Sequence, residues 1–271
     1  MEPYSLKNTY PTKDQIPNIR KTQTRRHINL KLPCPLIGNK NLFILVFHFL
    51  HSVLGAMYHD LGNWKLKGTT TVAFKCIDGV VMATDTRATV LPGFVAHKRV
   101  KKVYQITRNV GMTIAGVPAE AVNLLDVLRA NAMLYQVQRK RIIPVKVVAN
   151  LASVVLFSQR LFPYEVQIII GGYDDEGYHI YSLDPFGSAI EDYMIATGSG
   201  SPVAYGVLES SYHDGITLEE GLVLAVKAIN AAIKRNAFTG DSFDVATITM
   251  EKGYTELAEE EKKRIFEKTL S

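Results

Sequence analysis

The pattern of apolar and polar residues divides the chain near residue 69. Residues 1–40 hold five prolines, scattered basic residues and no sustained apolar period, so this stretch is expected to be irregular. Residues 41–57 form the most apolar segment, but His48 and His51 interrupt it. It is also short for a membrane-spanning helix, which needs roughly 20 residues. Patterns of regular secondary structure begin only after residue 68.

Short apolar runs bounded by turn residues predict the strands of a folded domain. The first two runs are joined by Asp78 and Gly79, which is a strong hairpin signal. β-Branched residues are frequent in these runs, as they are in most strands. The expected strands are residues 70–77, 80–85, 103–106, 110–115, 166–171, 179–183, 189–196 and 244–250.

Helical spacing separates these groups of strands. Apolar residues recur every three or four positions from Ala121 to Tyr135, behind Pro118, which suits the first turn of a helix. Thr217 and Glu220 have the spacing of a capping box, which predicts the start of a later helix. The expected helices are residues 118–135, a second from Pro144 toward Pro163, and residues 202–212, 218–235 and 259–268.

The order of these elements predicts the fold class. Strands and helices cluster, instead of alternating strictly one by one, which favours the α+β class with strand groups packed on each other and helix pairs outside. The composition, 47% hydrophobic and 21% charged, is that of a folded chain. Disorder and collagen-like repeats are therefore excluded.

The basic character of the chain belongs to its first part. Residues 1–68 carry a net charge of +7 and residues 69–271 one of −2, so the formal charge of +5 does not indicate a nucleic-acid partner. The two cysteines, Cys34 and Cys76, are too few for a disulfide framework or a zinc knuckle. A reducing compartment is expected.

Three interpretations of the first residues stay open. They form a membrane or export signal, or a removable pro-segment, or the start codon is assigned upstream of Met57, so that residues 1–56 are not translated. The polar lead of about 40 residues is too long for an ordinary signal peptide. We expect no stable membrane association.

Familiar catalytic motifs are missing from the sequence. It has no nucleophile elbow, no phosphate-binding loop, no dinucleotide fingerprint and no zinc-protease helix. His97, His179 and His213 are too dispersed to propose a metal site, and no cofactor is expected. Three consecutive threonines from Thr69 would on their own indicate a plain strand.

Several separate motifs, taken together, are far more specific. They are Gly68 with Thr69, the segments 83–88 and 112–116, the pair Lys101 and Lys102, and the segments 181–184, 197–202 and 244–249. In this order and spacing they resemble a catalytic β subunit of the 20S proteasome, closest to the archaeal type, from Gly68 to about Leu257. The resemblance implies the N-terminal nucleophile hydrolase fold, a four-layer αββα sandwich. Residues 1–68 are then a leader removed on maturation, and residues 69–271 a single catalytic domain.

The resemblance implies a threonine-type endopeptidase that makes its own active site. Thr69 Oγ attacks the Gly68 carbonyl, and cleavage between the two residues leaves a hydroxyl and an α-amine on Thr69. A chain-terminal amine is a suitable base, since its reference pKa is about 7.7–8.0. No metal is needed for this chemistry.

The resemblance also assigns the neighbours of the nucleophile. Asp85 and Lys102 match a buried carboxylate and ammonium, although counting from Thr69 points to Lys101 instead. The carboxylate makes burial of the cation tolerable, and the cation helps keep the amine neutral. The other catalytic positions implied are Gly116, whose N–H faces the oxyanion, Ser199 beside the amine, Asn236 and Thr239.

Residues implied for substrate binding lie between these positions. Thr89 resembles the residue that hydrogen-bonds the substrate backbone as an added strand. Ala88, Ile114 and Pro118 correspond to the side-chain pocket and include no acidic residue. An apolar residue before the scissile bond is therefore expected.

One position departs from the family pattern. Asn236 stands where the family usually has an aspartate that supports Ser199 and Thr69. An amide keeps the hydrogen-bond geometry but supplies no charge, so reduced turnover is expected. A weak or silent structural β subunit of the same particle is the alternative function.

The resemblance implies a large assembly in the cytoplasm. Two inner β rings of seven subunits, with or without other β paralogues, would lie between two rings of α subunits, and the substrate would be unfolded polypeptide. A separate regulatory ATPase ring would use ATP, because this chain has no nucleotide motif. The related bacterial two-ring peptidase is disfavoured by helix length and by the segment 198–202.

Overall fold

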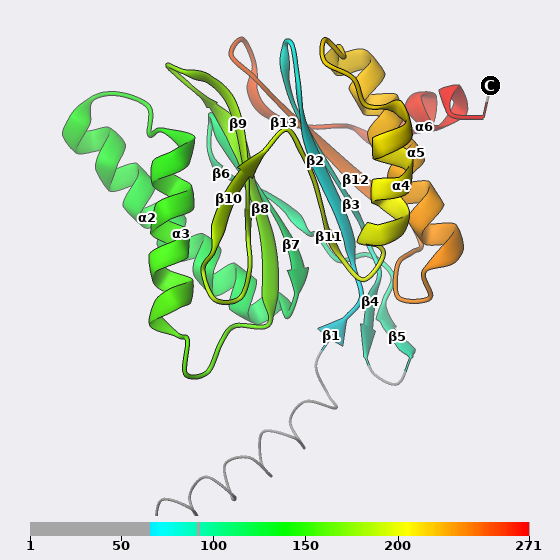
Figure 1. Ribbon diagram of the computed structural model, residues 1–271, viewed down its shortest axis with the longest axis horizontal. Coiled ribbons are helices and arrows are strands. Elements are labelled where there is room, and N and C mark those ends of the chain that lie inside the picture. Colours follow the sequence, from blue (N-terminus) through cyan, green and yellow to red (C-terminus); the bar gives the residue numbers. More distant parts are fainter. Residues whose placement is uncertain (1–65, 91–92, 271) are drawn as a thin grey trace, which may run out of the picture. The chain divides into compact units, whose positions relative to one another are not determined.

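Apolar residues on both faces of the two main sheets arrange the domain in four layers. The computed structural model describes residues 66–90 and 93–270. Two five-stranded sheets pack face to face, as Figure 1 shows, and helices cover both outer faces. The helices are α2 (Pro118–Arg139) and α3 (Val145–Ser158) on one side, and α4 (Ser201–Ser211), α5 (Leu218–Arg235) and α6 (Glu259–Lys268) on the other. The predicted αββα sandwich is confirmed.

One main sheet holds the strands that flank the predicted nucleophile. Its neighbouring strands are antiparallel throughout. Their order is β11 (Met194–Gly198), β2 (Thr70–Cys76), β3 (Gly79–Asp85), β12 (Phe243–Thr249) and β13 (Gly253–Glu256). The hairpin predicted at Asp78 and Gly79 joins β2 to β3.

The other strands form the second main sheet and a small third one. The second main sheet has the order β10 (Ala189–Asp192), β9 (Gly177–Leu183), β8 (Val166–Asp174), β7 (Val110–Gly116) and β6 (Val103–Thr107). The third sheet has the order β1 (Leu66–Lys67), β4 (Ala88–Val90) and β5 (Phe94–His97). It lies at one end of the sandwich, where β1 leads into β2 (Figure 1).

Three apolar cores fill the spaces between the layers. Because successive side chains of a strand point to opposite faces, β2 places Val72 and Phe74 against α4 and α5 but Ala73 against the other sheet. In β8, Ile168 and Ile170 likewise face α2 and α3, while Ile169 faces the sheet-to-sheet core. Continuous apolar strands are therefore needed where a sheet is covered on both faces.

The strand predicted at residues 189–196 is wrong in one respect. The chain turns at Tyr193, so that β10 and β11 belong to different main sheets. The Tyr193 N–H donates to Asp192 Oδ1 at 2.7 Å, and the Tyr193 carbonyl accepts the Lys75 N–H at 2.9 Å. β-Rich sequence on both sides of this bend hides it from pattern analysis.

Short strands were missed and some boundaries shift. Strands β4, β5 and β13 were not predicted, since each has only three or four residues. Helices α5 and α6 have the predicted bounds, α2 continues to Arg139 and α3 ends at Ser158. The predicted capping box is confirmed: the Thr217 N–H donates to Glu220 Oε2 at 2.9 Å, and its hydroxyl accepts the Glu220 N–H.

The predictions for the leader fall outside the described residues. These are the irregular stretch 1–40, the apolar segment 41–57 and the start at Met57. Within residues 66–90 and 93–270, no helix combines the length and the apolar character that crossing a membrane requires.

The sheet-to-sheet core predicts a large cost for deleting Met82. This side chain is fully buried between the two main sheets, so Met82→Ala is expected to lower the free energy of unfolding by about 2–5 kcal/mol. Met250→Ala is the matched control, since Met250 is 52% exposed just after β12, and a change within about 0.5 kcal/mol is expected. Urea denaturation followed by circular dichroism measures both, and equal losses would contradict the assignment of this core.

Candidate active site

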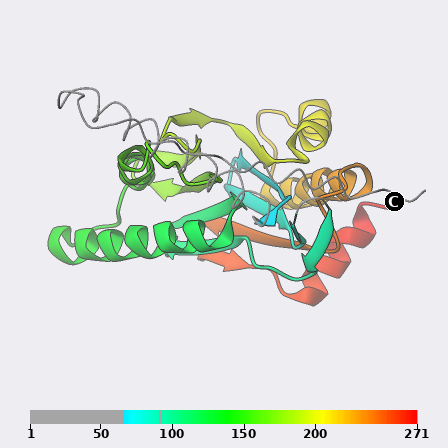
Figure 2. The ribbon, with the colours of Figure 1, turned by 90° about the horizontal axis from the view of Figure 1, so that it is seen from below.

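Thr69 lies at the end of the sandwich where the small sheet meets β2. It is the last residue before β2, and only 4% of its surface is exposed. Figure 2 looks onto this end, where β1, β4 and β5 gather beside the main sheets. The predicted site residues come from the small sheet, from both main sheets and from the segments around them, and they gather around Thr69.

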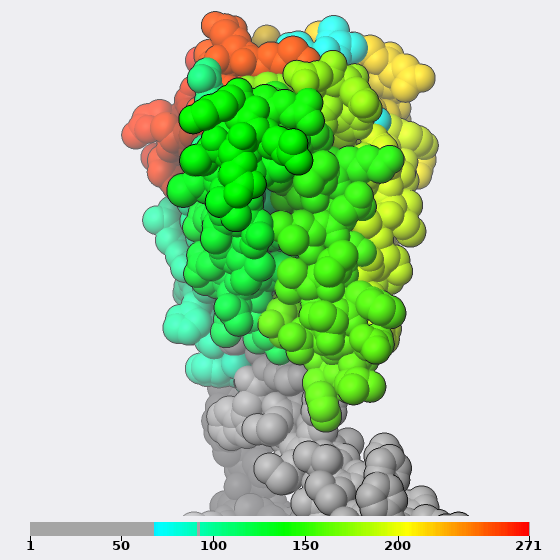
Figure 3. All heavy atoms as spheres, turned by 90° about the vertical axis from the view of Figure 1, so that its left-hand side faces the viewer, coloured from blue at the N-terminus to red at the C-terminus, as the bar shows by residue number. Residues whose placement is uncertain are grey.

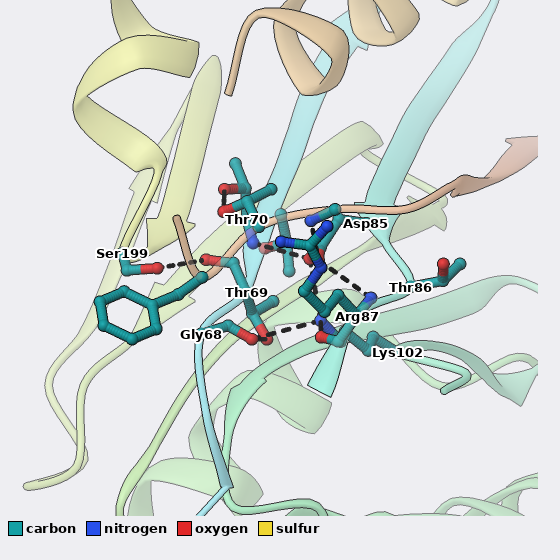
Figure 4. A network of polar contacts seen from close by, with 12 residues as sticks. Gly68, Thr69, Thr70, Asp85, Thr86, Arg87, Lys102 and Ser199 are labelled. Carbon is teal, nitrogen blue, oxygen red and sulfur yellow. Dashed lines mark hydrogen bonds and ion pairs between the residues drawn. The ribbon is translucent and has the colours of Figure 1, made fainter. Parts of the chain in front are cut away.

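The peptide bond before Thr69 is held in an unusual conformation. Gly68 has a φ of +104°, and a side chain there would strike the backbone and Cβ of Phe238. Only glycine adopts this conformation without strain and fits this space. The Thr69 hydroxyl donates to the Gly68 carbonyl oxygen at 2.6 Å, so the predicted nucleophile and its predicted target are adjacent (Figure 4).

A buried ion pair lies beside this bond. The Lys102 ammonium contacts Asp85 Oδ1 at 2.9 Å, and the two side chains are 5% and 0% exposed. Its other two hydrogens point to the carbonyl of Arg87 and, at 3.4 Å, to that of Gly68 (Figure 4). All three N–H donors of the ammonium therefore have an acceptor.

The Asp85 carboxylate is equally well paired. Oδ1 also accepts the Thr70 N–H at 2.9 Å, and Oδ2 accepts the N–H groups of Arg87 at 3.1 Å and Gly240 at 3.0 Å. Burying two charges is favourable only when their polar atoms are satisfied in this way. Lys101, the alternative lysine, points away and contacts Glu256 at 2.6 Å on the surface.

Burial shifts both groups of the pair toward their neutral forms. It lowers the pKa of Lys102, against the attraction and hydrogen bond of Asp85. It raises the pKa of Asp85, opposed by Lys102 and by the N–H groups of Thr70 and Gly240. A lysine with a lowered pKa gives up a proton more readily than an exposed one, which suits proton transfer beside Thr69.

Ser199 and Asn236 approach Thr69 from the opposite side. The Ser199 hydroxyl donates to Asn236 Oδ1 at 3.0 Å and lies 3.4 Å from the Thr69 carbonyl oxygen. The Asn236 amide nitrogen donates to the Ser199 carbonyl at 3.0 Å, which a carboxylate could not do. Thr239 donates to Asn236 Oδ1 at 2.9 Å and shares a 2.8 Å hydrogen bond with Thr70, not with Thr69.

Gly116 and the predicted pocket residues surround the remaining sides. Gly116 ends β7 with a φ of +129°, and a side chain there would strike the Glu165 carbonyl. A cavity of about 380 Å³ lies on the Ser199 side of Thr69. A much smaller one, about 10 Å³, is lined by Gly68, Thr69, Ala88, Val100, Lys102, Ile114, Gly116 and Pro118.

The backbone before Gly68 forms a strand with β4. Residues Leu66 and Lys67 pair antiparallel with Val90 and Thr89. Thr89 is 1% exposed, and its hydroxyl has no hydrogen-bond partner within the described part of the chain. The added-strand arrangement expected at Thr89 for a substrate is thus adopted by the chain's own residues before the predicted cleavage site.

Four residues of this site were not singled out by the sequence. No role was predicted for Phe238, Val100 or Asp241, and their proximity comes from the tertiary fold. Arg87 lies inside the motif 83–88, but no role was predicted for its side chain. Among the residues that the structure describes, no three His, Cys, Asp or Glu side chains gather as a metal site would require.

Comparisons with known proteins identify the family. The sequence profile described as Proteasome subunit matches residues 66–248. Curated proteins named Proteasome subunit beta are 49% identical over 213 residues in Ferroglobus placidus, 47% over 210 in Archaeoglobus profundus and 45% over 201 in Methanothermobacter thermautotrophicus. The alignments cover 78%, 77% and 74% of this chain and 99%, 97% and 95% of those relatives.

These matches and the αββα fold confirm the resemblance found in the sequence. The fold is that of the N-terminal nucleophile hydrolases, a class that includes peptidases. The chain belongs to the proteasome subunit family, and its relatives named above are β subunits. Membership in this family implies assembly into a proteasome complex.

The two neighbouring lysines give a test of the buried pair. Lys102→Ala leaves Asp85 buried without its cation, so the free energy of unfolding is expected to fall by about 3–5 kcal/mol. Lys101→Ala removes a surface pair whose lysine is 49% exposed, and a loss of about 0–1 kcal/mol is expected. Urea denaturation of both variants measures the difference, and a larger loss for Lys101→Ala would contradict the placement of the two side chains.

Proposed function

We propose that the chain is a threonine-type endopeptidase of the proteasome core, with Thr69 as nucleophile after cleavage between Gly68 and Thr69. The observation that carries the proposal is the Thr69 hydroxyl at 2.6 Å from the Gly68 carbonyl oxygen, beside the buried pair of Lys102 and Asp85. A threonine with a purely structural role before a strand would not require a buried ion pair beside it.

The first reaction is self-processing. Thr69 Oγ attacks the Gly68 carbonyl carbon, the C–N bond between the residues breaks, and the hydroxyl proton passes to the departing nitrogen. Water then hydrolyses the ester, which releases the leader with a Gly68 carboxylate and restores the hydroxyl. Lys102 donates to the Gly68 carbonyl oxygen at 3.4 Å and stabilises the negative charge that develops there.

The second reaction is hydrolysis of substrate. The free α-amine of Thr69 takes the proton of its own hydroxyl while the oxygen attacks a peptide carbonyl. The proton then passes to the leaving nitrogen as the substrate C–N bond breaks, and water hydrolyses the resulting ester, which releases the second product and restores the hydroxyl. The nearby ammonium of Lys102 disfavours protonation of this amine, and Asp85 keeps that ammonium in place. A backbone donor such as the Gly116 N–H typically contributes about 2.7–4 kcal/mol to the transition state.

The strand before Gly68 indicates how a substrate would lie. A peptide in the position of Leu66 and Lys67 would pair with Thr89 and Val90, so that its next residue presents its carbonyl to Thr69. Its side chain would then point toward the small cavity lined by Ala88, Ile114, Pro118 and Val100, which is about 10 Å³ and would have to widen to admit it. The lining supports a preference for an apolar residue before the scissile bond.

The same geometry favours an active subunit over a silent one. Asn236 holds the Ser199 hydroxyl, the Ser199 carbonyl and Thr239 with both ends of its amide. It therefore keeps the positions of these groups without a negative charge. A silent structural subunit would retain its leader, and the intact mass of the assembled subunit shows whether the leader is present.

Exposed apolar residues on two helices support assembly into rings. Helices α2 and α3 form one face of the domain, the green surface in Figure 3. Large apolar side chains are exposed on it, which is the composition of a buried interface. We propose that such faces contact α subunits and other β subunits in an α7β7β7α7 particle in the cytoplasm. A separate ATPase ring would supply this particle with unfolded polypeptide. The exposed apolar residues of this face are Val122, Val127, Met133, Leu134, Val137, Val147, Val154 and Phe157.

Thr69→Ala tests the nucleophile. The variant is expected to keep its leader in intact-mass measurements and to lose peptide hydrolysis in assembled particles, because no other hydroxyl occupies this position. Thr69→Ser is the conservative control and is expected to retain cleavage at reduced rate. Unchanged peptidase activity of Thr69→Ala particles, with no other β subunit present, would overturn the proposed function.

Fluorogenic peptides test the pocket. Peptides with Leu or Tyr before the scissile bond are expected to be cleaved faster than the matching peptide with Arg, since the pocket lining holds Lys102 and no acidic residue. The ratio of kcat/KM values is the measurement. Faster cleavage after Arg would contradict the apolar preference.

A further inference from the structure

The Arg87 side chain makes contacts that the proposed reaction does not use. Its Nε donates to Asp241 Oδ2 at 3.1 Å and one terminal nitrogen to Asp241 Oδ1 at 2.9 Å, which is a two-point ion pair. The other terminal nitrogen donates to the Ala237 carbonyl at 3.1 Å. The guanidinium thus binds the loop 236–241 at two places, near its start and at its end.

The backbone of the same residue contacts the catalytic pair. The Arg87 N–H donates to Asp85 Oδ2 at 3.1 Å, and the Arg87 carbonyl accepts the Lys102 ammonium. The N–H also lies 2.7 Å from the Gly240 carbonyl. Arg87 is therefore joined at its backbone to the ion pair (Figure 4), and its side chain is joined to the loop.

The loop 236–241 carries the groups that support Thr69 on its other side. Asn236 holds Ser199, Thr239 binds the Thr70 hydroxyl, and the Gly240 N–H donates to Asp85. A side chain at Gly240 would strike the guanidinium of Arg87, so the two lie in direct contact. Any shift of this loop would move Ser199's partner and one donor to Asp85 together.

We propose that the Arg87–Asp241 ion pair is a positioning clamp. It fixes the loop 236–241 so that the Ser199–Asn236 pair and the Asp85–Lys102 pair keep their positions on the two sides of Thr69. This inference rests on the proposed function of Thr69. Arg87 and Asp241 touch no reacting atom through their side chains, so both are positioning residues and not catalytic ones.

The chemistry of the pair fits positioning better than stability. The two side chains are 22% and 32% exposed, and ion pairs of that exposure add little to folding stability. The hydrogen bonds from Arg87 nevertheless lower the pKa of Asp241. A planar guanidinium with three acceptors also fixes orientation in a way that a lysine ammonium does not.

The test uses assembled, processed particles and two conservative variants. Arg87→Lys keeps the charge but loses the forked contact, and Asp241→Asn keeps the shape but loses the charge. Each is expected to lower kcat about tenfold for a fluorogenic peptide with Leu before the scissile bond, because small misplacement of catalytic groups is costly. KM is expected to stay within about twofold, and the double variant to lose no more than the worse single one.

Matched variants on the same molecule control for the loss of a surface ion pair. Arg99→Lys alters a pair with Glu259 at 3.3 Å, and Asp126→Asn one with Arg129 at 3.9 Å. Neither pair contacts the loop 236–241, and unchanged kcat is expected for both. Melting temperatures of all variants are measured alongside.

The outcomes separate this inference from the proposed function. Unchanged kcat of Arg87→Lys and Asp241→Asn, additive losses in the double variant, or a rise in KM alone would overturn the clamp. A loss of kcat that follows a fall in melting temperature would also overturn it, since the role would then be structural. Thr69→Ala particles that still hydrolyse peptide would overturn the proposed function itself, whatever these variants do.

Discussion

The buried pair of Asp85 and Lys102 is the constraint on which the site depends. Because both charged side chains are buried, their hydrogen-bond donors and acceptors must be satisfied by other groups of the protein. Thr70, Arg87 and Gly240 supply those partners from the start of β2, the segment between β3 and β4, and the loop before β12. The surroundings of Thr69 are therefore organised by the hydrogen-bonding and charge requirements of one ion pair.

The order of strands and helices predicted the packing of strand groups between helix pairs, and the family resemblance supplied the candidate site residues. The clustering of strands and helices predicted the α+β class, and the capping box at Thr217 predicted the start of α5. The bend at Tyr193 was missed because it comes from one side-chain hydrogen bond of Asp192, inside β-rich sequence. Arg87 and Asp241 are 154 positions apart, and no local pattern connects residues that only the tertiary fold brings together.

The choice between the two lysines illustrates the same limit. Motif resemblance favoured Lys102, whereas counting from Thr69 favoured Lys101, and one residue of loop length decided between them. In the fold, adjacent residues of an extended segment face opposite ways, so one lysine enters the interior and the other meets Glu256 at the surface. The two lysines therefore differ in burial, which their spacing in the sequence does not show.

The strand formed by Leu66 and Lys67 has a consequence for how the particle would mature. Under the proposed reaction, attacking oxygen and target carbonyl belong to consecutive residues, so the first turnover is unimolecular and independent of protein concentration. The chain's own backbone holds the β4 edge until that event, which keeps foreign polypeptides from it. Activation would then require no encounter with another protease.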